Sequence, residues 1–151
     1  MANNMDDISD ELVRTTLLAR TTFSNEKVNE IGARLRYVTE MMEKLPSPPC
    51  DGDFLMIIKN NEPHFWYFIQ SDKNTIGRDD SNDIELWDND ISRTHCRVNK
   101  VGSDWEIVDN NSSNGFRVNA ATATSRILCD GDLISMGSYE VIFVVNKPIE
   151  Y

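Results

Sequence analysis

The spacing of hydrophobic residues changes near residue 50 of this chain. Before that point, apolar residues recur at every third or fourth position, a period that predicts amphipathic helices. After it, short runs rich in Val, Ile, Phe, Tyr and Trp alternate with clusters of Gly, Asn, Asp and Ser, which is typical of strands joined by turns. The sequence therefore predicts a helical segment followed by a domain made mainly of β-structure.

The helical segment contains two candidate helices. The first covers about residues 7–22, and the second starts after Ser24, which we expect to cap its N-terminus. Apolar residues of the second helix follow the a and d positions of a heptad, at Val28, Ile31, Leu35, Val38, Met42 and Leu45. This stripe can pack within the chain, for example as a helical hairpin, or form a coiled-coil homodimer through residues 24–45.

Proline-rich sequence at residues 46–49 ends the second helix, because proline cannot continue one. Short apolar runs follow at residues 54–59, 64–69, 75–77, 84–86, 96–101, 105–108, 116–118, 127–128, 133–136 and 139–145. Many short strands at close spacing predict an antiparallel β-sandwich or barrel. We divide the chain into a helical segment at 1–46, a linker at 47–53, a β-domain at 54–146 and a C-terminal tail at 147–151.

The composition narrows the classes of partner. The chain has 151 residues, 26% of them charged, with a formal net charge of −10. This acidic balance argues against nucleic acid and against an anionic membrane, because binding either one requires a basic face. The net charge does not exclude the binding of a single phosphate group. A few hydrogen-bond donors directed at the phosphate act at short range, whereas charges farther away than about 10 Å are screened by salt.

The first residues contain no signal peptide, and no apolar run is long enough to span a bilayer. The three cysteines are widely spaced and odd in number. We therefore expect a cytoplasmic protein with reduced thiols.

Three stretches carry the candidate chemistry, and each lies at the end of a predicted strand: Thr75–Arg78, Ser92–His95 and Asn110–Gly115. They supply arginines, serines and a carboxamide, which donate hydrogen bonds to phosphate and to peptide backbone. No nucleophile paired with a base is evident, and His95 and Cys96 would point to opposite faces of a strand. We expect no enzyme activity, no cofactor and no metal site.

These stretches resemble the signature of the forkhead-associated (FHA) domain: Gly77-Arg78, Ser92-Arg93-Thr94-His95 and Ser113-Asn114-Gly115, in this order and spacing. Asp83-Ile84, Asp109, Val118-Asn119, Asp130-Gly131-Asp132 and Gly137 extend the similarity over about residues 51–146. The resemblance implies a β-sandwich of two sheets that binds phosphothreonine peptides through loops at one end. Asn119-Ala120 departs from the Asn-Gly pair common in the family.

The resemblance assigns phosphate binding to Arg78 and to the hydroxyl of Ser92, and it makes Arg93 a second cation. A guanidinium suits this role because its fixed fork of donors matches phosphate oxygens. His95 corresponds to a histidine that we expect to hold the serine loop in place. The alternative is a solvated or salt-bridged side chain for Arg78 and a solvated side chain for Arg93.

Ser113 and Asn114 correspond to residues that shape the groove and pair with ligand backbone. Ser113 stands where the family often has threonine, and Gly77 and Gly115 are expected to serve backbone geometry. Asp90 lies in a region that touches the third ligand residue after phosphothreonine in family members. A carboxylate there would favour a basic or neutral ligand residue over an acidic one.

The predicted function is a phosphothreonine-binding adaptor that recognises proteins phosphorylated by a serine/threonine kinase. The alternative is a phosphate-independent assembly module that binds a protein through another face of the same fold. The paired threonines Thr15-Thr16 and Thr21-Thr22 are either plain helix-surface residues or phosphorylation sites that the domain itself binds.

Overall fold

The computed structural model describes residues 25–147 of the chain. The first candidate helix, the cap at Ser24 and the paired threonines lie outside this range. The chain divides into two compact units, residues 1–37 and 38–151. The helix α2 runs over Asn25–Lys44, with Glu26 in its first turn and Lys44 in its last, charges that complement the helix dipole.

The end of α2 belongs to the same compact unit as the β-domain. Met41 is the buried residue of this helix, at 1% exposure, whereas its neighbour Met42, which the heptad pattern placed in the stripe, is half-buried. The ammonium of Lys44 donates to the carbonyl oxygen of Asn61 at 3.1 Å. Trp66 donates its indole N–H to the carbonyl oxygen of Pro46 at 2.9 Å, which fixes the start of the linker to the β-domain.

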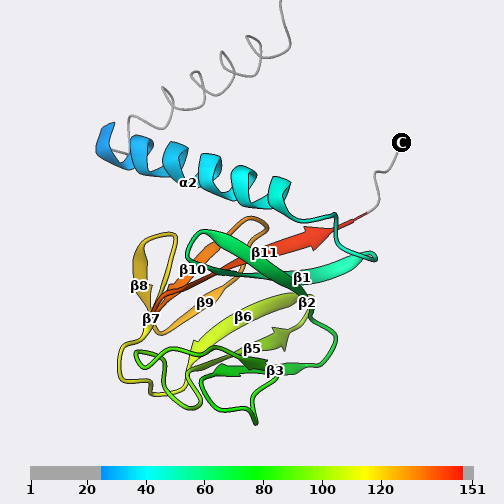
Figure 1. Ribbon diagram of the computed structural model, residues 1–151, viewed down its shortest axis with the longest axis vertical. Helices are drawn as coiled ribbons and strands as arrows, with labels where there is room; N and C mark the ends of the chain where they lie inside the picture. Colours follow the sequence, from blue (N-terminus) through cyan, green and yellow to red (C-terminus); the bar gives the residue numbers. More distant parts are fainter. Residues whose placement is uncertain (1–24, 148–151) are drawn as a thin grey trace, which may run out of the picture. The chain divides into compact units, whose positions relative to one another are not determined.

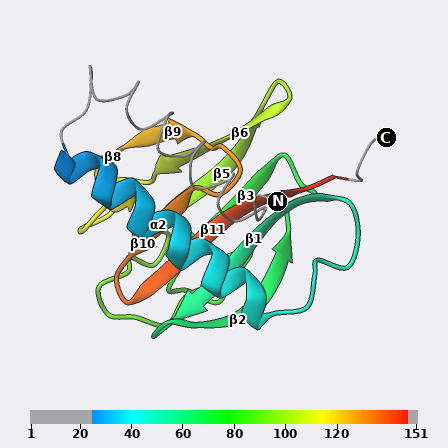
Figure 2. The same ribbon diagram turned by 90° about the horizontal axis from the view of Figure 1, so that it is seen from above.

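Two sheets form the β-domain, one of six strands in the order β2-β1-β11-β10-β7-β8 and one of five in the order β4-β3-β5-β6-β9. The six-stranded sheet contains β1 (Gly52–Lys59), β2 (Glu62–Phe68), β7 (Phe116–Val118), β8 (Ala121–Ala123), β10 (Leu133–Met136) and β11 (Tyr139–Asn146). The five-stranded sheet contains β3 (Lys73–Gly77), β4 (Ile84–Glu85), β5 (Cys96–Val101), β6 (Asp104–Asp109) and β9 (Ser125–Ile127). Figure 1 shows the two sheets stacked, and Figure 2 shows β11 running between β1 and β10.

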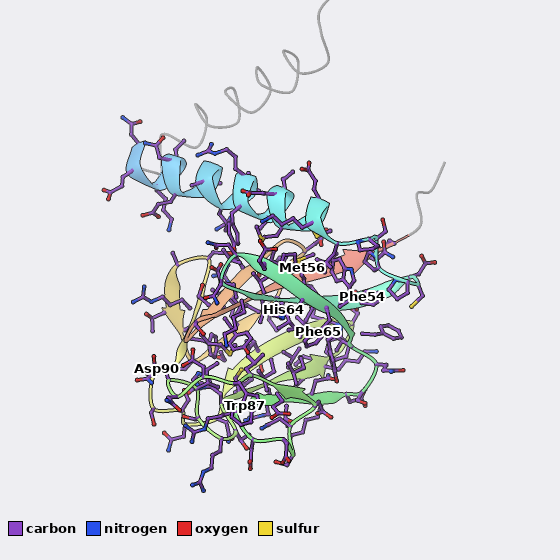
Figure 3. All side chains as sticks on the ribbon, in the orientation of Figure 1. Phe54, Met56, His64, Phe65, Trp87 and Asp90 are labelled. Carbon is purple, nitrogen blue, oxygen red and sulfur yellow. The ribbon has the colours of Figure 1, made fainter. Side chains whose placement is uncertain are left out.

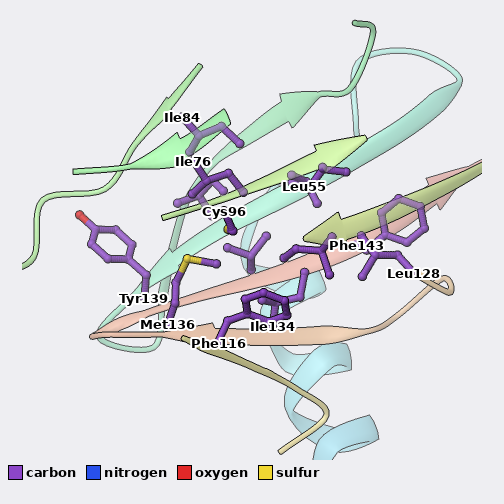
Figure 4. Packing of buried hydrophobic residues seen from close by; sticks show 14 of the residues in the cluster. Leu55, Ile76, Ile84, Cys96, Phe116, Leu128, Ile134, Met136, Tyr139 and Phe143 are labelled. Carbon is purple, nitrogen blue, oxygen red and sulfur yellow. The ribbon is translucent and has the colours of Figure 1, made fainter. Parts of the chain in front are cut away.

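The core lies between the sheets, where alternate residues of each strand point inward. Figure 4 shows Ile134, Met136 and Phe143 of the six-stranded sheet facing Ile76 and Cys96 of the other. Strand β1, which lies between β2 and β11, is buried on both faces, because Phe54, Met56 and Ile58 are at most 1% exposed as well. Burial on both faces explains its continuous run of apolar residues.

The predicted mainly-β sandwich is confirmed, with differences in detail. The pair β3–β4 is parallel, whereas the other strand pairs in the described residues are antiparallel. The strand β8 was not predicted, because its Ala-Thr-Ala sequence has weak strand propensity and lies at an exposed sheet edge. The strand predicted at residues 127–128 differs from β9, which is Ser125–Ile127, and Leu128 is a buried residue beyond its end.

Candidate functional site

Backbone hydrogen bonds draw three loops together at one end of the sandwich: those between β3 and β4, between β4 and β5, and between β6 and β7. The amide of Arg78 donates to the carbonyl oxygen of Ser92 at 3.0 Å, and the amide of Asn110 donates to that of His95 at 2.9 Å. The three predicted stretches are therefore adjacent in space, although they are far apart in sequence.

Gly77 allows the first two loops to approach this closely. A Cβ atom at this position would lie 2.2 Å from the carbonyl oxygen of Arg93, closer than any real side chain permits. The amide group of Asn82 crosses the same junction, since it donates to Arg93 at 2.6 Å and to the carbonyl oxygen of Asp79 at 2.8 Å. The need for glycine here is steric, and Asn82 is a supporting residue that sequence reasoning missed.

His95 lies beneath the loops and is fully buried, at 0% exposure. Its Nδ1 accepts from the amide of Ser92 at 3.0 Å, and its Nε2 lies 2.7 Å from the carbonyl oxygen of Gly115. The ring must therefore be protonated at Nε2, which donates to that oxygen. Both nitrogens are used within the protein, so the ring ties the second loop to the third and has no lone pair left for a metal or a substrate.

Above this support is a pocket of about 490 Å³, which we call the Arg78 pocket. Four of the five residues predicted to bind phosphopeptide line it, together with Asp90 and four residues to which the sequence analysis gave no binding role. The lining residues are Arg78, Asn89, Asp90, Ile91, Ser92, Arg93, Thr94, Asn110 and Ser113. Asn114 lies beside this pocket and lines a neighbouring one.

The cations of the Arg78 pocket have little to bind within the protein. Within residues 25–147, neither Arg78 nor Arg93 forms an ion pair, although Asp79 and Asp80 follow Arg78 directly. The contact of Arg78 with the carbonyl oxygen of Asn89 is long, at 3.5 Å. The site therefore presents two guanidinium groups that an anion can bind.

Ser92 is oriented toward the same space. Its Oγ accepts from the amide of Ser113 at 3.0 Å, which leaves the hydroxyl hydrogen able to donate to a ligand. Asn114 donates to the carbonyl oxygen of Asp90 at 2.8 Å, and its own Oδ1 remains an acceptor for a peptide N–H. The third loop is closed by Gly115, whose φ of 69° is in the left-handed region and whose amide donates to Ser112.

Asp88 is a second supporting residue that sequence reasoning missed. Its carboxylate accepts from the amide of Ser138 at 2.6 Å and from the amide of Asp90 at 2.8 Å. Hydrogen bonds to Ser138, above all to its side chain, and to the Asp90 amide lower the pKa of Asp88. Asp88 thus joins the β10–β11 turn to the β4–β5 loop, where Figure 3 places Trp87 and Asp90.

The other titratable groups within residues 25–147 form no catalytic arrangement. Burial raises the pKa of the Cys96 thiol well above its ordinary value, and the thiol is 0% exposed, so it is a structural core residue. The part of the chain that the structure describes contains no cluster of three or more His, Cys, Asp and Glu residues suited to a metal ion. None of its helices is both long enough and apolar enough to cross a membrane.

The family model of the FHA domain matches residues 74–137, the region that contains all three loops. The glycogen accumulation regulator GarA of Mycolicibacterium smegmatis is 30% identical over 142 residues, 93% of this chain and 87% of that protein. The chain belongs to the FHA domain family. The oxoglutarate dehydrogenase inhibitor of Corynebacterium diphtheriae is 26% identical, over 89% of this chain and 91% of that protein.

Solved FHA domains have the same fold. The FhaA FHA domain, complexed with the intracellular domain of Rv3910, is 30% identical with a TM-score of 0.56, over 61% of this chain and 99% of that one. A structure from an analysis of phosphothreonine-dependent FHA domain interactions is 29% identical with a TM-score of 0.56, over 64% of this chain and 99% of that one. Relatives of this FHA protein thus include a named regulator and a named inhibitor of an enzyme.

Proposed function

We propose that this FHA protein is a phosphothreonine-binding adaptor, without catalytic activity of its own, that recognises proteins phosphorylated by a serine/threonine kinase. The observation that carries this proposal is the Arg78 pocket, which Arg78, Arg93 and Ser92 line together: neither arginine has an ion pair in the described residues, and the serine hydroxyl hydrogen is available. A phosphoryl group carries close to two negative charges at neutral pH and accepts several hydrogen bonds. It is the ligand that this set of donors fits best.

Each predicted residue has a role in this proposal. Arg78, Arg93 and Ser92 bind the phosphoryl oxygens, and Ser113 and Asn114 position the peptide. Gly77, His95 and Gly115 hold the loops. The acceptor Oδ1 and the remaining amide hydrogen of Asn114 pair with ligand backbone, as an extended peptide requires.

Calorimetric titration with a phosphothreonine peptide library tests the proposal. Matched libraries with phosphoserine and with unmodified threonine serve as controls. We expect phosphothreonine peptides to bind and unmodified peptides to show no measurable heat. Equal affinity for both would favour the phosphate-independent assembly module, in which the partner contacts another face.

Asp90 is proposed to set specificity beyond the phosphate. It is exposed and lines the same pocket as both arginines. Its carboxylate repels an acidic ligand side chain and attracts a basic one. A peptide array that varies the third position after phosphothreonine should therefore disfavour Asp and Glu, and a preference for Asp there would reject this role.

Dimerisation is proposed through residues 24–45, because a dimer would increase avidity for clustered phosphosites. Leu35, in the middle of the heptad stripe, is 47% exposed. Analytical ultracentrifugation of the full chain and of Leu35→Glu tests this, since a wild-type monomer would contradict it. The setting that we propose is the cytoplasm, where kinases and reduced thiols occur together.

A further inference from the structure

A second pocket, of about 280 Å³, adjoins the third loop at Asn114 and Gly115. Asn114 and Gly115 line one wall, and the remaining walls come from β7, β8 and the end of β10. We call it the Arg117 pocket, after its cationic residue. Asn114 and Gly115 are the predicted site residues that line it. The family resemblance gives the pocket itself no role.

Three polar side chains of this pocket form a row across neighbouring strands. In the strand register, Arg117 is opposite Ser135 of β10 on one side and opposite Thr122 of β8 on the other. Directly opposite residues of an antiparallel pair project to the same face, with Cβ atoms about 5 Å apart. Arg117 alternates with the buried Phe116 and Val118, so the row lies on the outer face of the sheet.

The side chains of Arg117, Thr122 and Ser135 can all donate hydrogen bonds. Within residues 25–147, no hydrogen bond or ion pair engages the side chains of Arg117, Thr122 or Ser135. A guanidinium between two hydroxyl groups repeats the chemistry of Arg78 with Ser92 in the first pocket. Such a set favours an anion, because charge-assisted hydrogen bonds to carboxylate or phosphate are about twice as strong as neutral ones.

We propose that the Arg117 pocket is a second anion-binding site, which takes an acidic side chain or a second phosphoryl group of the ligand already anchored in the Arg78 pocket. The proposal rests on the proposed function, since the first phosphate sets the position of the ligand. Arg117 supplies the charge, and Thr122 and Ser135 supply hydroxyl donors on either side of it.

The geometry of the third loop supports one ligand chain across both pockets. Consecutive residues, Ser113 and Asn114, line the Arg78 pocket and the Arg117 pocket respectively. An extended peptide advances about 3.3 Å per residue, so a side chain only a few positions from phosphothreonine reaches the second pocket. The proposed contact of Asn114 with ligand backbone lies on this path.

Glu140 limits where the anion can bind. It is opposite Ser135 on β11, on the far side of Ser135 from Arg117, and so extends the same row with a negative charge. An anion centred over Ser135 would be repelled, and one between Arg117 and Thr122 would be attracted. The pocket therefore accepts one anionic group at its β7–β8 side.

A series of phosphothreonine peptides tests the proposal with the full chain. At each position within four residues of the phosphothreonine, one peptide carries Glu, one carries a second phosphothreonine, and the reference carries Gln. We expect at least one anionic peptide to bind about threefold or more tightly than its reference, the size of a partly exposed ion pair. The Glu and phosphothreonine peptides show which kind of anion the pocket prefers.

Variants assign that gain to the second pocket. Arg117→Gln should abolish the gain while the Gln reference binds as before, and Thr122→Val and Ser135→Ala should each reduce it. Arg126→Gln is the matched control, because Arg126 is an exposed arginine on β9 that lines neither pocket. A gain that survives in Arg117→Gln, or no gain at any position, overturns the second site while reference binding upholds the first.

Titration with inorganic phosphate can detect anion binding at the second site independently of the first, even if no peptide binds. In ¹H–¹⁵N spectra of Arg78→Ala, millimolar phosphate should still move the amide signals of Arg117, Thr122 and Ser135. In Arg117→Gln, it should move only signals of the Arg78 pocket. Unmoved signals at the Arg117 pocket in the wild type and in Arg78→Ala would overturn the proposal.

Discussion

The inner and outer sides of the three-loop cluster differ in how many of their polar groups form hydrogen bonds or ion pairs within the protein. On the inner side, His95 bonds through both ring nitrogens, and the Asn82 amide bonds to two carbonyl oxygens. On the outer side, Arg78 and Arg93 have no ion pair in the described residues, and the hydroxyl hydrogen of Ser92 is available. The polar groups on the inner side of these loops therefore have their hydrogen-bond partners within the protein, whereas groups on the outer side are available to a ligand.

This difference separates residues that fix the fold from residues that bind. A buried polar group must find its partners inside the protein, because leaving it unpaired costs about 1–3 kcal/mol. An exposed cation needs no partner within the protein, because water solvates it until a ligand binds. Substitutions on the inner side should therefore change stability, and substitutions on the outer side should change affinity.

The largest effect on stability is expected for His95→Ala. The substitution removes two hydrogen bonds, leaves the amide of Ser92 and the carbonyl oxygen of Gly115 unpaired, and opens a cavity. We expect a loss of about 3 kcal/mol in the free energy of unfolding, measured by urea denaturation. The matched control is His64→Ala, because His64 is exposed on β2. Equal stability of both variants would contradict the supporting role of His95.

Arg78→Ala is the corresponding test of the outer side. It should leave the free energy of unfolding almost unchanged and weaken phosphothreonine-peptide binding by about 1.5–3 kcal/mol, the scale of a hydrogen bond to a charged group. A cycle of wild type and variant with phosphorylated and unmodified peptides isolates the coupling of Arg78 to the phosphate. If both peptides lose the same affinity, Arg78 does not act through the phosphoryl group.

Asp88 lies between the two extremes, because its carboxylate is partly exposed yet accepts amides from two loops. Its pKa is lowered, so its stabilising contribution is present above the ordinary aspartate pKa and is lost as the pH falls through the lowered value. Asp88→Asn should cost about 1 kcal/mol at neutral pH, after allowance for screening, and the deficit should shrink on acidification.

Urea denaturation across the acidic range measures this difference, with Asp80→Asn as control. Asp80 is an exposed aspartate of the β3–β4 loop with no described side-chain hydrogen bond. A deficit that does not depend on pH would show that the ionised carboxylate is not what joins the two loops.

The smallest effect is expected away from the loop cluster, at the β7–β8 turn. Asn119 and Ala120 have φ values of 53° and 69°, so the turn keeps left-handed geometry although alanine replaces the glycine common in the family. Ala120→Gly should raise the free energy of unfolding by about 0.5 kcal/mol, because relief of strain exceeds the added chain entropy. Unchanged or lower stability in urea would contradict this, and phosphopeptide affinity should not change.

The five candidate binding residues could be named from the sequence because they stand in short motifs that resemble the FHA signature. Four of these five residues line one pocket, and their binding of phosphopeptide stays a prediction. Asn82 and Asp88 act through contacts that only the fold creates. Asp88, for example, bonds to Ser138, which is 50 residues away in the chain.

Prediction of the fold was limited in the same way, by contacts that do not appear in the local sequence. Strands with strong alternation or continuous apolar runs were found, whereas β8 was missed because its residues are small and exposed. Heptad spacing placed Met42 in the apolar stripe, yet Met41 is the residue that is buried. Positions 38, 41 and 45 also follow helical spacing, so period alone could not choose between them.

A crystal structure of the chain with a bound phosphothreonine peptide tests the central claim most directly. We predict phosphoryl oxygens within hydrogen-bonding distance of the Arg78 guanidinium and the Ser92 hydroxyl, with His95 still bonded to Gly115. A phosphoryl group bound elsewhere on the sandwich, or an Arg78 side chain turned into solvent in the complex, would contradict it.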